Sequence, residues 1–145
     1  MIKPFEYFIK ENLARKSNSN ISMAKSLLQK AAIRLKRIAI SKIEESESSI
    51  VFEDVYECLR EASQSLMEIK GYKPYSHEAL ISFLKEQKFL SEENINMLDN
   101  YRILRNNSVY KAEKVSLPKC LEAIEFAKHV LPELENKFKE LSEEK

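Results

Sequence analysis

Apolar residues recur every three or four positions through most of this chain, which is the spacing that places them on one face of an α-helix. Across residues 21–45 the apolar positions are Ala24, Leu27, Leu28, Ala31, Leu35, Ile38 and Ala39. Across residues 50–70 they are Val51, Val55, Leu59, Ala62, Leu66 and Ile69. Neither series alternates as a half-buried strand does, so two long amphipathic helices are predicted, with a turn at residues 46–49 between them.

The remaining helices are predicted mainly from the residues that cap them. A short helix is expected over residues 4–16, where it is ended by the polar run SNSN. Serine is a favoured N-cap, and three serines precede further apolar-periodic segments. The segments are a short helix, a helix over residues 92–111, and a last helix that reaches about residue 141 with a kink near Pro132. The three serines are Ser76, Ser91 and Ser116.

Long amphipathic helices joined by short loops predict an all-α protein. We expect a single domain spanning residues 1–145, folded as an antiparallel up-and-down bundle of four to five main helices plus short helices, without a sheet. The single glycine, Gly71, agrees with this prediction and lies where a helix-ending glycine belongs, after residues 50–70. Phosphate-binding loops require several glycines, and this chain has one. A P-loop and a dinucleotide-binding Rossmann fold are therefore excluded.

The composition narrows the class of protein further. The chain is 43% hydrophobic and 32% charged, and no apolar run approaches the roughly 18 residues of a membrane-spanning helix. The N-terminus lacks the apolar segment of a signal peptide, so a cytoplasmic protein without membrane contact is expected. Cys58 and Cys120 are predicted to be reduced, buried thiols. Two cysteines and two histidines at unrelated spacings predict no metal site, and no organic cofactor is expected.

Charge is distributed unevenly, although the net charge is only +1. Residues 12–43 contain basic but no acidic side chains: Arg15, Lys16, Lys25, Lys30, Arg34, Lys36, Arg37 and Lys42. Residues 44–68 contain a single base, Arg60, among the acids Glu44, Glu45, Glu47, Glu53, Asp54, Glu57, Glu61 and Glu68. Two interpretations are open: the two helices attract each other across the bundle, or the basic helix presents a surface to phosphates.

Two arginines fall on the apolar stripe of the helix predicted over residues 92–111. On a helical wheel this stripe contains Ile95, Leu98, Tyr101 and Val109. Arg102 and Arg105 project within it, although arginine is rarely buried unless it is paired. Three interpretations are open: the arginines extend their charged ends to solvent, they pair with acids of the preceding long helix, such as Glu57 or Glu61, or they serve a ligand.

Asn106 and Tyr110 lie beside these arginines, on a ridge of the same helix that starts at Arg102. Two guanidiniums, a carboxamide and a phenol along one groove suit the phosphate, the ribose and the base edge of a nucleotide. We therefore predict that these residues bind a phosphate-bearing ligand.

These residues also carry a family resemblance. The segment LRNNSVYKAEKVS (104–116) resembles the signature of the HEPN family, in which an arginine, usually followed by asparagine, precedes a histidine in the pattern Arg-x4-6-His. The stretch at residues 53–84, with its GYKPYSHE turn, is similar to the middle of that family, and VSLPKCLEAIEFAKHVLPEL is similar to its last helix. The resemblance covers about residues 20–140.

The resemblance implies an antiparallel helical bundle that forms a homodimer, with two arginine motifs facing one cleft. Many HEPN proteins are metal-independent ribonucleases, and many are toxins paired with a minimal nucleotidyltransferase antitoxin; others only bind nucleotides or partners. Matched residue by residue, Arg105 corresponds to the family arginine and Asn106 to the asparagine after it. Tyr110 occupies the place of the catalytic histidine.

That substitution weakens the case for catalysis. Metal-free RNA cleavage needs a group that takes a proton near neutral pH, as imidazole does with a pKa of about 6.5, whereas a phenol has a pKa of about 10. A tyrosine that the family often carries two residues later is here Ala112. His77 is either a structural residue of its helix start or a substitute base, and the helix dipole there favours its neutral form.

Three functional hypotheses follow. The first is a HEPN protein that binds nucleotide or RNA and partners a separate minimal nucleotidyltransferase in a toxin–antitoxin-like pair, with weak or no catalysis. The second is an active metal-independent ribonuclease toxin that uses Arg105, Tyr110 and His77. The third is a non-catalytic protein-interaction module.

Overall fold

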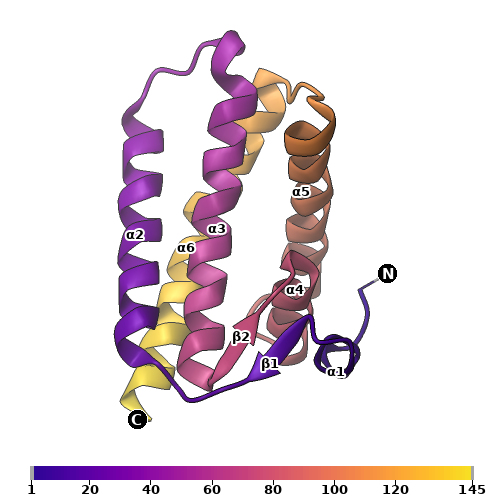
Figure 1. The fold of residues 1–145 in the computed structure, drawn as a ribbon. Coiled ribbons are helices and arrows are strands. Elements are labelled where there is room, and N and C mark those ends of the chain that lie inside the picture. The colour runs from indigo at the N-terminus through magenta and orange to yellow at the C-terminus, as the bar shows by residue number, and fades with distance from the viewer. Residues whose placement is uncertain (1, 145) are drawn as a thin grey trace.

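The computed structural model describes residues 2–144 and confirms a predominantly helical bundle (Figure 1). Six α-helices, a 3-10 turn and two short strands follow one another along the chain. In chain order they are α1 (Phe5–Lys10), β1 (Ala14–Lys16), α2 (Ile21–Ile40), η1 (Glu45–Glu47), α3 (Ser48–Lys70), β2 (Tyr72–Pro74), α4 (His77–Glu86), α5 (Glu92–Lys111) and α6 (Leu117–Glu143). The long helices α2, α3, α5 and α6 run up, down, up and down, as an antiparallel bundle does.

Helix α3 forms the centre of the bundle. It packs against α2 and α6 along its length and against α4, α5 and β2 as well. Phe52, Leu59 and Leu66 are at most 1% exposed, and fourteen of its residues are buried. The buried side chains of α3 include two acids, Glu61 and Glu68.

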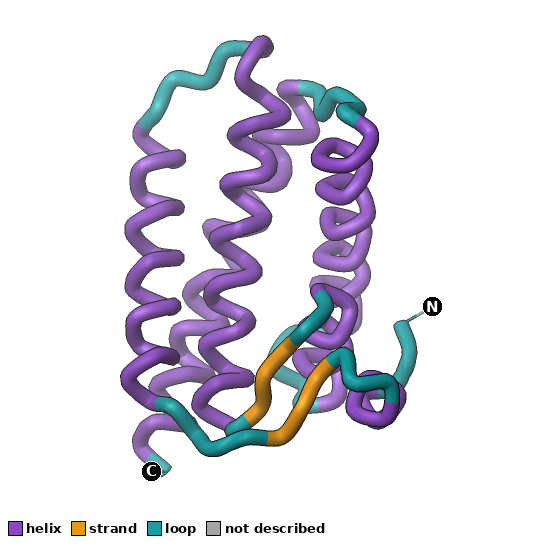
Figure 2. The backbone as a smooth tube through the Cα atoms, in the orientation of Figure 1, coloured by secondary structure: helices purple, strands orange, loops and turns teal. Residues whose placement is uncertain are grey.

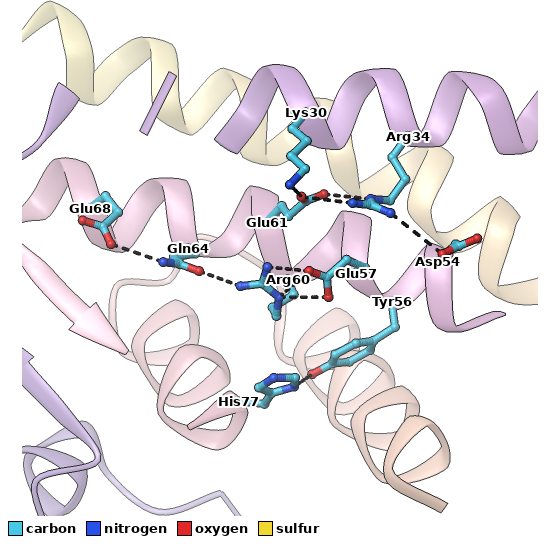
Figure 3. A network of polar contacts seen from close by, with 10 residues as sticks. All are labelled: Lys30, Arg34, Asp54, Tyr56, Glu57, Arg60, Glu61, Gln64, Glu68 and His77. Atoms are coloured by element: carbon cyan, nitrogen blue, oxygen red, sulfur yellow. Dashed lines mark hydrogen bonds and ion pairs between the residues drawn. The ribbon is translucent and has the colours of Figure 1, made fainter. Parts of the chain in front are cut away.

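Buried carboxylates are tolerated only when they are paired, and α2 supplies the partners of Glu61. Arg34 Nε lies 3.0 Å and Lys30 Nζ 3.6 Å from the carboxylate oxygens of Glu61, and Arg34 also reaches Asp54 at 3.8 Å (Figure 3). The interpretation that the basic and acidic helices attract each other is therefore confirmed for these residues. Glu68 is paired differently, with Lys73 Nζ of β2 at 2.6 Å.

The first predicted helix is wrong in its second half, and with it the expectation of a bundle without a sheet. Helix α1 ends at Lys10, Asn12 adopts a left-handed φ of 59°, and the chain then extends as β1. This strand pairs antiparallel with β2, so that Arg15 lies opposite Lys73 (Figure 2). The partner strand is far away in the sequence, and apolar spacing within residues 4–16 contains no information about it.

Most other boundaries agree with prediction, because the caps act locally. The hydroxyl oxygens of Ser76, Ser91 and Ser116 each accept the backbone N–H three residues ahead. Helix α5 has the predicted bounds, and α6 runs without interruption through Pro132 to Glu143. Helix α2 stops at Ile40 rather than near residue 45, since the chain turns there and Ile43 packs against the core.

Both cysteines are buried and free, as predicted. Within residues 2–144, none of the helices combines the length and the apolar character needed to cross a bilayer.

Gly71 joins the centre of the bundle to the two-stranded sheet. It ends α3 with a left-handed φ of 87°, and its carbonyl oxygen accepts the backbone N–H of Ser17. A Cβ atom at this position would lie 2.8 Å from the backbone oxygen of Ser17. The turn therefore requires glycine both for its conformation and for its space.

We expect Gly71→Ala to lower the free energy of unfolding by about 2 kcal/mol or more, from the left-handed backbone and the clash with a backbone atom. Urea denaturation measures this change. Ala112→Gly is the matched control: Ala112 is exposed and also has a left-handed φ, of 52°, so glycine there should stabilise by about 0.5–1 kcal/mol. An unchanged stability of Gly71→Ala would contradict this account of the turn.

Candidate functional site

Helix α5 positions four of the five predicted site residues. Ile95, Leu98 and Tyr101 are buried, as the wheel predicted, but Val109 is 41% exposed. The buried positions advance by three residues at a time, and each such step turns back by about 60° on a helix of 3.6 residues per turn. The contact face therefore winds around α5, so that Ser108, which donates to Glu53 at 2.8 Å, takes the inward place near the end.

Arg102 is a paired residue. Its side chain is 14% exposed, its Nε lies 2.8 Å from Asp99 Oδ1, and its Nη1 lies 3.6 Å from Glu78 Oε1 at the start of α4. The alternative in which the α5 arginines pair with Glu57 or Glu61 is wrong. Those acids are held by Arg60 and by the α2 cations, respectively (Figure 3).

Arg105 is in a different state. Its side chain is half-buried, and no carboxylate of residues 2–144 lies within 4 Å of its guanidinium. The guanidinium carbon lies 5.9 Å from the ring centroids of both Tyr56 and Tyr110, within the range of a cation–π contact. Within residues 2–144, its one side-chain hydrogen bond is to Asn106 Oδ1 at 3.2 Å. Arg105 is thus a partly desolvated cation held by two aromatic rings.

Tyr56 connects Arg105 to His77, the fifth predicted residue. The rings of Tyr56 and His77 stack with centroids 5.5 Å apart and planes inclined by 13°, and Tyr56 Oη lies 3.2 Å from His77 Nδ1 (Figure 3). Tyr56 is buried, and burial raises the pKa of its phenol, against the effect of Arg102 and Arg105. It therefore stays protonated and serves as a hydrogen-bonding partner of the imidazole.

Burial also lowers the pKa of His77, and the positive charges of Arg105 and Arg60 lower it further, whereas Glu57 opposes them. The neutral imidazole that the helix dipole was expected to favour is thus supported by burial and by neighbouring arginines. Its Nδ1 faces Tyr56, and its Nε2 has no hydrogen-bond partner among residues 2–144. A neutral ring with a free nitrogen can donate to a ligand or accept a proton from one.

We call these residues the Arg105 cluster: Tyr56, His77, Arg102, Arg105, Asn106 and Tyr110. The structure brings Arg105, Asn106 and Tyr110 into contact and links His77 to Arg105 through Tyr56. Tyr110 is 75% exposed, so one wall of the cluster is open to solvent. The arrangement offers a cation, a ring for stacking and a neutral imidazole, which together suit a phosphate-bearing aromatic ligand.

Sequence reasoning missed Tyr56. It lies on the core-facing side of α3, between Val55 and Cys58, which are fully buried. A tyrosine in such a row requires a partner for its hydroxyl group, and that requirement was a usable signal. The sequence does not indicate that this partner is His77, 21 residues away.

No group of three or more histidine, cysteine or acidic side chains that could hold a metal ion occurs within the described part of the chain. Comparison of the chain with family models, with curated proteins and with solved structures gives no match. Membership of the HEPN family therefore stays a prediction from the sequence motifs.

The lowered pKa of His77 should appear as a pH dependence of the free energy of unfolding. Because its pKa in the folded protein lies below the ordinary 6.5, the unfolded state binds the proton more readily, and stability must rise with pH as His77 loses its proton in the unfolded chain. We expect His77→Gln to lose this part of the pH dependence between about pH 5 and pH 7, measured by thermal unfolding at a series of pH values. His129→Gln on the exposed side of α6 is the control and should leave the profile unchanged.

Proposed function

We propose that this protein is a HEPN-like domain that binds a nucleotide or RNA through the Arg105 cluster. In this proposal it partners a separately encoded minimal nucleotidyltransferase, in a toxin–antitoxin-like pair, and has weak or no catalytic activity. The observation that carries the proposal is the half-buried Arg105, which has two aromatic neighbours but no carboxylate partner among residues 2–144.

Arg105 differs from the other partly buried arginines of the bundle. Removing a guanidinium from water is unfavourable unless an anion compensates, and Arg34, Arg60 and Arg102 each have a carboxylate within hydrogen-bond distance. Arg105 has none in the described part of the chain, so a phosphate group would supply the compensating charge. The exposed ring of Tyr110 adds a surface on which a base can stack, an interaction worth about 1–3 kcal/mol per base.

The proposal includes a homodimer, as the resemblance implies. Exposed apolar side chains on α5 support it, since Ile103 is 46% and Val109 41% exposed next to the cluster. Two copies that meet along α5 would cover these side chains and bring two arginine motifs to a shared polar cleft. Light scattering that gives the mass of one chain at micromolar concentration would contradict this part of the proposal.

Cellular context is part of the same proposal. We place the protein in the cytoplasm, where free cysteines such as Cys58 and Cys120 stay reduced; cell fractionation tests this. The gene that adjoins this one tests the partner. A small nucleotidyltransferase encoded there supports the pair, and a neighbour of unrelated chemistry contradicts it.

An active metal-independent ribonuclease is the second candidate, and the state of His77 favours it. Cleavage requires a group that accepts the proton of the ribose 2′-hydroxyl, and a neutral imidazole with a free Nε2 can do so near pH 7. In this candidate Arg105 neutralises the phosphate, Tyr110 positions the RNA and Tyr56 orients His77.

The binding proposal predicts that Arg105→Ala abolishes ligand binding and leaves the fold intact. Arg105 has no carboxylate partner among residues 2–144, so removing its side chain leaves no carboxylate without a cation. The free energy of unfolding should therefore change by less than about 1 kcal/mol. Calorimetric titration with ATP and with a short single-stranded RNA should show at least about a tenfold loss of affinity. Lys111→Ala, an exposed cation of the same helix, is the matched control. A destabilised Arg105→Ala protein that still binds would remove Arg105 from the site.

Catalysis provides a separate prediction. If a phenol at position 110 limits RNA cleavage, Tyr110→His should increase cleavage in a chelator-containing, metal-free assay, since general acid–base catalysis contributes about 10²–10⁴-fold. Tyr110→Phe, which keeps the ring but also lacks an imidazole, is the control and should not gain activity. Strong cleavage by the unaltered protein that is lost in His77→Gln would instead favour the ribonuclease.

A further inference from the structure

Helix α2 presents an unusual face to solvent, on the side of the bundle away from α5 (Figure 1). Ile33 is 61% and Ile40 80% exposed, and the two are seven residues apart, so they lie two turns apart on one line. Lys36 flanks this line on one side and Arg37 on the other, and Lys25 extends the basic edge toward the start of the helix. We call these five residues the α2 face.

The charges of the α2 face are not neutralised within the bundle. Lys30 and Arg34, which lie closer to α3, are held by Glu61 and Asp54 (Figure 3). Lys25, Lys36 and Arg37 have no carboxylate within 4 Å among residues 2–144. The helix thus uses its inward cations for the fold and leaves its outward cations for solvent.

A hollow of about 360 Å³ adjoins this face, between α2 and the beginning of α3. Ile33 and Arg37 belong both to the α2 face and to the lining of the hollow, so the two are continuous. Its other walls include the apolar side chains of Ile38, Ile43 and Val51. A volume of this size accommodates a few side chains of a partner, with Arg37 at the rim to meet a carboxylate.

We propose that the α2 face docks an acidic, amphipathic helical segment of another protein. One bulky apolar side chain of that segment enters the hollow beside Ile33 and a second packs on Ile40, while flanking acids of the segment pair with Lys36 and Arg37. The proposal does not rest on the Arg105 cluster, whose residues belong to α3, α4 and α5.

Charge and shape favour a protein segment over other anionic partners. Lys30, Arg34, Glu47 and Asp54 also line the hollow. The two cations are already engaged by Glu61 and Asp54, so the carboxylates of Glu47 and Asp54 would still oppose phosphates of RNA or of an anionic bilayer that are pressed into the hollow. A helical segment can place its acids against the basic edge and its apolar side against the hollow, leaving these two carboxylates at a distance. Isoleucines at the centre of a basic stripe add nothing to phosphate binding but suit the apolar line of such a segment.

The test starts from peptides selected on the folded protein from a random library displayed on phage. Selected peptides should be rich in Asp and Glu, with bulky apolar residues at spacings of three or four. Fluorescence anisotropy with the synthetic peptides should show at least about a tenfold loss of affinity for Arg37→Glu and for the double variant Ile33→Ser/Ile40→Ser. The control Leu121→Ser/Lys139→Glu changes an exposed leucine and an exposed lysine of α6 and should bind normally.

Both α2 variants alter exposed side chains, and thermal unfolding verifies that they fold. Selection that yields no peptide, peptides without acidic residues, or peptides that bind the α2 variants as well as the unaltered protein would overturn the proposal. So would binding to phosphatidylglycerol vesicles or to single-stranded RNA that is lost in the same variants, since the occupant would then be a lipid or a nucleic acid. Self-association that disappears in Ile33→Ser/Ile40→Ser would assign the face to a second copy of this chain.

Discussion

Helix α3 is enclosed by its neighbours, and every polar side chain that it directs inward has to find a partner inside the bundle. Glu61 is bound by Arg34 and Lys30 of α2, and Glu68 by Lys73 of β2. No buried side-chain nitrogen or oxygen of residues 2–144 lacks a hydrogen-bond partner. Removing one member of a buried ion pair typically costs about 3–5 kcal/mol. These contacts therefore fix which elements lie next to α3 and their positions along its axis.

The same constraint distinguishes Arg105 from the other arginines near α3. Arg34, Arg60 and Arg102 each form an ion pair with a carboxylate and so stabilise the packing of the bundle. Arg105 is placed by two aromatic rings and by a hydrogen bond to the neutral side chain of Asn106, and one of the rings, Tyr56, is itself fixed by its contact with His77. Aromatic rings orient a guanidinium without neutralising it, so the framework holds a charge in position and leaves it available to an anion.

Local information in the sequence predicts the helices well, and long-range pairing accounts for most of the errors. The serine caps and the bounds of α5 depend on residues within one turn, and the structure confirms them. Three contacts join separate elements, which periodicity cannot relate: the pair of Arg102 with Glu78, the contact between Tyr56 and His77, and the pairing of β1 with β2. Even on α5, a straight wheel placed Val109 inside because it ignored the winding of the contact face around the helix.

The pairing of residues 14–16 with residues 72–74 constrains the order in which the protein can fold during its synthesis. Strand β1 leaves the ribosome first and has no partner until α2, the turn after it and all of α3 have been synthesised. At about 5–20 residues per second this delay lasts several seconds, far longer than a helix needs to form. The pairing of β1 with β2 therefore cannot begin before both long helices have been synthesised, so during synthesis this contact closes the first half of the bundle and cannot start its folding.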